Sequence, residues 1–208
     1  MESNLSISRP LFRRKLYISN SPYYLERSQE DGEKDLVRLA KKARREDGWT
    51  FYEDTKRWLH LTNGHSEMEE KGIRNMEVSC TLIEGPCVLG SDPTHYHLHP
   101  DYMIENDIED LGEHAYVIGS LPSPGDIRAA LSIPDYKWKI ATSRGITTYE
   151  PFSEEASEIK WSSLLGSKLK EDQLVLEQEG FAKGLEIMLE RLNKETEGIL
   201  RLSYKPMN

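Results

Sequence analysis

Three histidines occupy alternate positions directly before a proline, as His95, His97 and His99 followed by Pro100. Residues i, i+2 and i+4 of a β-strand point to the same face of the sheet, so the three imidazoles would share one face. Neutral imidazole is a common zinc ligand, and a carboxylate can act as a third ligand. The pattern therefore predicts a strand on which two imidazoles can bind a single metal ion.

A second run, Ser123-Pro124-Gly125-Asp126, has the features of a helix start. Serine suits the N-cap, proline the first helical position, and an acidic residue at the third position completes a capping box. A carboxylate in the first turn can point beyond the helix end, and the hydroxyl of Ser123 would lie near the same point. A site with three protein ligands keeps one coordination position for water, which is typical of hydrolytic zinc.

Composition excludes several classes of protein. The 208 residues suffice for one sizeable core, and 37% hydrophobic and 30% charged residues are ordinary for a soluble domain. A net charge of −9 argues against binding to nucleic acid. No run of about 18 apolar residues and no charged-then-apolar leader is present, so we expect no membrane association and a cytoplasmic location. Cys80 and Cys87 form no CxxC pair and are expected to be reduced thiols.

Hydrophobic periodicity and turn residues divide the chain into helices and strands. Helices are predicted over 35–45, from 123 onward, and over 172–192. Strands are predicted over 16–18, 49–52, 57–61, 76–83, 88–89, 96–99, 116–120, 138–141, 146–149 and 199–204. Residues 1–14 would form a polar arm, and 15–208 one domain with an acidic insertion near 101–114. Because helices and strands are mixed without regular alternation, we expect an α+β sandwich with a mixed, largely antiparallel sheet.

The run His97-Leu98-His99-Pro100 followed by Ser123-Pro124-Gly125-Asp126 resembles the signature of the JAB/MPN/JAMM family of zinc metalloproteases. That signature is His-x-His-Pro, then Ser-x-x-Asp at the start of a helix. Residues 122–131 and 139–149 are also similar to the helix opening and strand pair of the family, and the resemblance covers about 35–152. It implies a JAB/MPN-like (cytidine deaminase-like) architecture, a zinc cofactor, and hydrolysis of a peptide or isopeptide bond. The substrate class it implies is a ubiquitin-like conjugate or a short peptide.

The resemblance also implies a role for each motif residue. Zinc would be bound by His97, His99 and Asp126, and Ser123 would donate a hydrogen bond to the oxyanion. The family has a glutamate base upstream of the histidines, for which Glu46 and Glu53 are candidates. Glu53 is preferred because it would lie in or just after a strand. The sequence leaves open whether iron or manganese can replace zinc.

Two departures from the family pattern leave alternatives open. Residues 101–122 make the gap between the two motifs longer than is usual, which we interpret as an insertion able to form a lid or a substrate-selecting loop. Neither candidate glutamate lies in a clear copy of the family's glutamate motif, so a non-catalytic JAB-fold interaction module is the alternative function. A cupin is a poor alternative because no histidine follows His114. His95 is expected to support the site or to lie on the surface, and His60, His65 and His114 to lie on the surface.

Overall fold

The computed structural model describes residues 24–61, 92–107 and 112–207. Its strands are β1 (Tyr24–Glu26), β2 (Asp47–Tyr52), β3 (Arg57–Leu61), β4 (Pro93–Leu98), β5 (Lys137–Thr142), β6 (Gly145–Pro151) and β7 (Leu200–Pro206). Its α-helices are α1 (Gln29–Ala40), α4 (Asp101–Asp107), α5 (Glu113–Gly119), α6 (Pro124–Ser132), α7 (Trp161–Gly166), α8 (Leu169–Glu179) and α9 (Phe181–Glu195), and a short 3₁₀ helix spans Glu154–Glu158. The predicted strands over 16–18, 76–83 and 88–89, the polar arm and both cysteines lie outside these residues.

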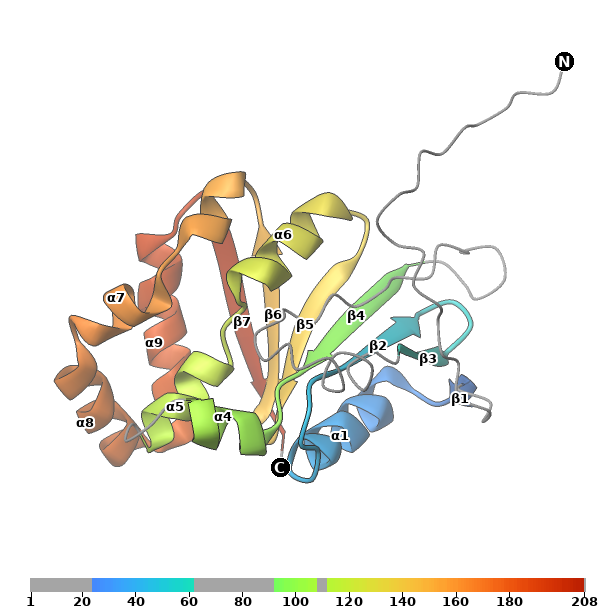
Figure 1. Cartoon of the computed structure of the whole chain (residues 1–208), viewed down its shortest axis with the longest axis horizontal. Coiled ribbons are helices and arrows are strands. Elements are labelled where there is room, and N and C mark those ends of the chain that lie inside the picture. The colour runs from blue at the N-terminus through green and yellow to red at the C-terminus, as the bar shows by residue number, and fades with distance from the viewer. Residues whose placement is uncertain (1–23, 62–91, 108–111, 208) are drawn as a thin grey trace, which may run out of the picture.

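The described strands form one seven-stranded sheet in the order β1-β3-β2-β4-β5-β6-β7 (Figure 1). Within it only β4 and β5 pair in parallel, and every other neighbouring pair is antiparallel. The parallel pair needs a crossover, which is supplied by α4, α5 and α6 between the two strands. The predicted α+β fold with a mixed, largely antiparallel sheet is therefore confirmed.

Side chains alternate between the two faces of the sheet, and helices cover both faces. Tyr96 and Leu98 of β4 belong to a core cluster with Leu36 and Val37 of α1. The opposite face packs in a second cluster against α6, α7, α8 and α9, to which β5 contributes Ile140. Since successive residues of a strand point to opposite faces, His97 lies on the face away from α1. The sheet thus separates the core under α1 from the histidine side.

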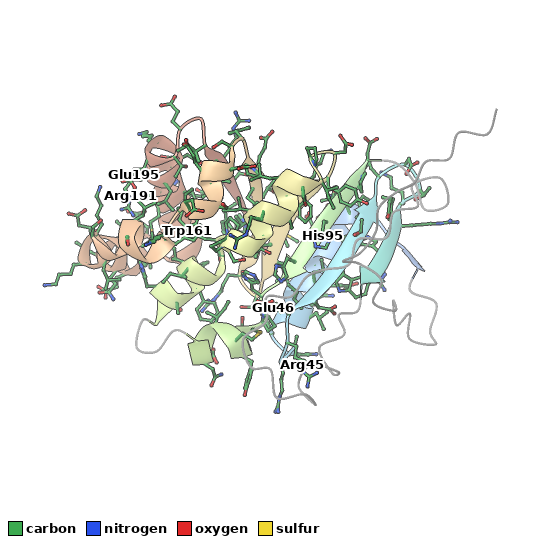
Figure 2. All side chains as sticks on the ribbon, turned by 45° about the horizontal axis from the view of Figure 1, so that its top comes forward. Arg45, Glu46, His95, Trp161, Arg191 and Glu195 are labelled. Carbon is green, nitrogen blue, oxygen red and sulfur yellow. The ribbon has the colours of Figure 1, made fainter. Side chains whose placement is uncertain are left out.

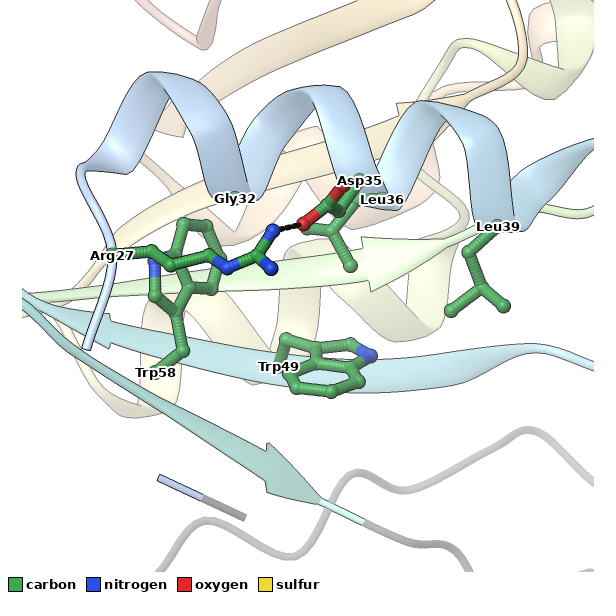
Figure 3. Close-up of a pocket in the computed structure, with 7 residues that line it drawn as sticks. All are labelled: Arg27, Gly32, Asp35, Leu36, Leu39, Trp49 and Trp58. Carbon is green, nitrogen blue, oxygen red and sulfur yellow. Dashed lines mark hydrogen bonds and ion pairs between the residues drawn. The ribbon is translucent and has the colours of Figure 1, made fainter. Parts of the chain in front are cut away.

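A small pocket lies under α1 on the face away from His97 (Figure 3). Its lining includes Trp49, Trp58 and Gly32, and the ion pair between Arg27 and Asp35 lies beside it. A Cβ atom at Gly32 would lie 2.1 Å from Cζ2 of Trp58, so the indole can pack under the helix only where a side chain is absent. None of the residues that line this pocket belongs to the histidine cluster on the other face of the sheet.

A buried carboxylate joins α1 to the sheet. Glu33 is only 2% exposed and accepts hydrogen bonds from Tyr96 Oη at 2.8 Å, Lys139 Nζ at 2.7 Å and Lys205 Nζ at 2.9 Å. Burial raises the pKa of Glu33, but the hydrogen bonds from the two lysines outweigh it, and the pKa lies below its ordinary value of 4.5. The carboxylate is therefore ionised and fully paired at neutral pH.

Replacing Glu33 with glutamine is expected to lower the free energy of unfolding at pH 7 by about 1–3 kcal/mol, the cost of an unmatched buried polar contact. Because the pKa is lower in the folded than in the unfolded chain, the contribution of Glu33 is complete above about pH 4.5 and is lost as the pH falls. Urea unfolding from pH 7 to pH 3 should show the difference between parent and variant shrinking. Glu30→Gln, on the exposed side of the same helix, should change the pH profile much less, because water screens the ion pair of Glu30 with Lys34. A pH-independent difference for Glu33→Gln would contradict this account.

Three predicted elements were wrong in type or extent. Most of the apolar run at 116–120 belongs to helix α5 rather than to a strand, because a short apolar run does not by itself distinguish the two and α5 packs beside α4 and α8. The helix predicted over 172–192 is two helices, since Gly180 adopts φ +76° between α8 and α9. The helix predicted over 35–45 runs from Gln29 to Ala40, with Ser28 as its N-cap.

None of the helices in the described part of the chain is both long and apolar enough to cross a membrane.

Candidate metal centre

Three separate segments meet at the carboxyl end of β4. His97 lies in the strand and His99 just beyond its end at Leu98. Strand β2 runs antiparallel to β4 with Gly48 opposite His97, so Glu46, just before β2, lies beside the same end (Figure 2). The crossover to β5 brings the N-terminus of α6, and with it Asp126, to this edge.

The side chains of these segments are in direct contact. His97 uses both ring nitrogens, with Nδ1 2.5 Å from Asp126 Oδ1 and Nε2 3.2 Å from Glu46 Oε2. Nε2 of His99 lies 4.0 Å from Glu46 Oε1, and the two imidazole centroids are 4.7 Å apart. Glu46, His97 and His99 each offer one donor atom, and the three atoms all lie within 4.8 Å of one another. The group is thus compact enough to bind one ion.

The start of α6 forms the predicted capping box. The hydroxyl oxygen of Ser123 accepts a hydrogen bond from the Asp126 N–H at 3.1 Å, and Asp126 Oδ2 accepts one from the Ser123 N–H at 2.8 Å. This box holds the Asp126 carboxylate so that its other oxygen, Oδ1, meets His97. The hydroxyl proton of Ser123 takes no part in the box, and the Ser123 side chain is exposed.

Both carboxylates are held in the ionised form. Burial raises the pKa of Asp126, but the charge and hydrogen bond of His97 outweigh it and hold the pKa well below its ordinary value of 3.8. Burial likewise raises the pKa of Glu46, and the hydrogen bond and charge of His97 again lower it below 4.5. Two anionic groups therefore flank one imidazole at neutral pH, which is a favourable environment for a cation.

Glu53 lies at the other end of β2. Its neighbour Tyr52 pairs with Pro93, whereas Gly48 pairs with His97, so Glu53 is about 16 Å from His97 along the strand at about 3.3 Å per residue. The side chain is exposed and forms an ion pair with Lys56. The structure thus brings Glu46, and not the preferred Glu53, to the histidines. The sequence placed both glutamates near β2, but only the strand register shows which end faces His97.

The first histidine of the series is a core residue. His95 is 2% exposed, its ring contacts Trp138 edge-on at 4.9 Å, and Nδ1 lies 3.4 Å from Thr50 Oγ1. Burial lowers the pKa of His95 to about 3, so the imidazole is neutral. His114, expected on the surface, is also buried because α5 packs against α8. The side chains of His60 and His65 lie outside the described residues.

Among the described residues, the donor atoms close enough to bind one ion belong to Glu46, His97 and His99, and Asp126 is not part of this group. The resemblance instead implies His97, His99 and Asp126 as ligands, with Glu53 or Glu46 as the base. The distances also allow His97 Nε2, His99 Nε2 and Glu46 to bind the ion, with Asp126 orienting His97 through Nδ1. Two imidazoles and one carboxylate suit zinc, and also iron or manganese.

A backbone group that sequence reasoning missed also contacts this site. The carbonyl oxygen of Gly119, at the end of α5, lies 2.6 Å from Nδ1 of His99. No sequence signal marks such a contact, because every residue type has the same carbonyl group.

Comparison with known proteins gives no relative for this chain. No family model, no curated protein and no solved structure matches it. The likeness to JAB/MPN/JAMM proteins therefore rests on the motif residues and their order along the chain.

Proposed function

We propose that this protein is a zinc-dependent hydrolase of the JAMM type that cuts a peptide or isopeptide bond in a ubiquitin-like conjugate or a short peptide. The observation that carries the proposal is the cluster of Glu46, His97 and His99 donor atoms within 4.8 Å of one another, with Asp126 bonded to His97. Of these residues, His97, His99 and Asp126 occur in the order of the family signature, which is His-x-His-Pro followed by Ser-x-x-Asp.

The chain supplies a group for each step of amide hydrolysis. A bound zinc ion supplies Lewis acidity, which lowers the pKa of a water ligand to about 7. Glu46 lies beside both imidazoles and can take a proton from the attacking water and pass it to the departing amine as the C–N bond breaks. The Ser123 hydroxyl can donate to the carbonyl oxygen as it gains charge, and such a donor is typically worth about 3 kcal/mol. The products are a carboxylate and an amine.

A non-catalytic interaction module of the same architecture is the second candidate. Its support is that the carboxylate of Asp126 is already satisfied within the protein, by His97 and by the backbone of Ser123. The two candidates differ in whether the purified protein contains zinc and hydrolyses peptides.

Zinc content measured after purification without chelators separates the two candidates. We expect about one zinc ion per chain in the parent and none after His97→Ala combined with His99→Ala, because two of three ligands are then lost. Peptide hydrolysis by the parent should disappear on chelation and return when zinc is added. A parent that is folded but free of zinc and without peptidase activity would favour the interaction module.

A further inference from the structure

His99 lies between the start of α4 and the end of α5. The chain passes from His99 through Pro100 directly into α4, where the N–H of Ile104 donates to the Pro100 carbonyl at 3.1 Å. Helix α5 returns and ends at Gly119, whose carbonyl oxygen lies 2.6 Å from His99 Nδ1. The two helices pack on each other, and Ile104 is only 4% exposed. His99 is therefore held from both ends of this segment.

The carbonyl of Gly119 is one of the helix-end acceptors that lack a partner within the helix. The last backbone donor of the helix, the N–H of Ser120, donates to the carbonyls of Tyr116, Val117 and Ile118 and not to that of Gly119. His99 supplies the missing donor. A carbonyl oxygen can only accept, so Nδ1 of His99 carries a proton, and Nε2 is the ring nitrogen left to bind a metal ion. Nε2 lies 4.0 Å from Glu46 Oε1.

The absence of a side chain at position 119 permits this contact. A Cβ atom there would lie 2.6 Å from Cδ1 and 2.7 Å from Cγ1 of Ile104. An added methyl group would therefore push α5 away from α4 and carry the carbonyl away from His99. The distance between Nδ1 and the carbonyl depends on a glycine packed against one isoleucine.

We propose that helices α4 and α5, which lie in the stretch interpreted above as an insertion able to form a lid or a substrate-selecting loop, position the imidazole of His99 by fixing its tautomer and ring orientation. The role of His99 as a ligand rests on the function proposed above, but the positioning itself does not. Gly119 is a positioning residue, because it acts on the metal only through His99. Partners of this kind that orient a ligand typically contribute 10- to 100-fold to metal affinity.

Cobalt(II) titration of the full-length protein tests the proposal. Gly119→Ala should weaken cobalt binding about 10- to 100-fold and alter the visible spectrum of the bound ion. Adding Ile104→Ala removes both atoms that the new methyl would meet and should restore most of the loss. Gly166→Ala is the matched control, because a Cβ atom there has no neighbour within 4 Å. Unchanged cobalt affinity in a folded Gly119→Ala protein would overturn the proposal.

Nitrogen NMR of the His99 ring in the metal-free parent provides an independent test. We expect the Nδ1–H tautomer in the parent and a mixture of both tautomers in Gly119→Ala. The Nε2–H tautomer in the parent would refute the positioning contact even if Gly119→Ala failed to fold. A parent that shows the Nδ1–H tautomer but binds no cobalt would support the positioning contact and refute the metal centre.

Discussion

Replacing Glu46 with glutamine is expected to reduce peptide hydrolysis roughly 10²- to 10⁴-fold, the usual contribution of a general base. Glu46 is the carboxylate that faces both imidazoles, with Oε2 3.2 Å from His97 and Oε1 4.0 Å from His99. Glutamine keeps the shape of the side chain and removes its charge and basicity. Steady-state hydrolysis of a peptide substrate by zinc-loaded parent and variant measures the effect.

Glu53→Gln is the matched control, because it removes the same charge from the other end of β2. Its activity should equal that of the parent. The zinc affinity of Glu46→Gln then separates the two assignments of the carboxylates. Retained zinc would make Glu46 the base and Asp126 the third ligand, whereas lost zinc would make Glu46 a ligand. Full activity in Glu46→Gln would exclude both assignments.

Replacing Asp172 with alanine is expected to lower the free energy of unfolding by about 3 kcal/mol. The substitution leaves the partly buried guanidinium of Arg191 without the carboxylate that binds it. Both carboxylate oxygens of Asp172 are engaged by Arg191, at 2.5 Å and 2.9 Å, in a forked contact that joins α8 to α9. Asp172 is 1% exposed, whereas 22% of the Arg191 side chain is exposed, so water reduces the cost only in part. Urea unfolding at pH 7 measures the change.

Glu171→Ala is the control for this experiment, since the neighbouring carboxylate is exposed on the same turn of α8. It should leave the unfolding curve almost unchanged. Combining Asp172→Leu with Arg191→Met removes both charges and should cost less than Asp172→Ala alone. A change of less than about 1 kcal/mol in Asp172→Ala would show that the ion pair contributes no more than an exposed pair does.

Much of the fold follows from local patterns in the sequence. The alternation around His95, His97 and His99 predicted a strand, and the serine, proline and aspartate of 123–126 predicted a capped helix, as the structure shows. Both features depend on residues within one turn or one strand, where steric and hydrogen-bonding preferences act directly. The strand predicted over 116–120 was wrong, because its structure does not depend on local preferences alone. Its hydrophobicity required burial, but only the packing partner decided between helix and strand.

The sequence by itself determined which residue types are available to a metal and which of them share a strand or a helix end. Only the tertiary structure decided that Glu46 rather than Glu53 faces His97, and that the Gly119 carbonyl meets His99. The first depends on the register between β2 and β4, and the second on the return of α5 after α4. Contacts between segments far apart in the chain arise from packing of the whole sheet and its helices. No local pattern around either residue encodes them.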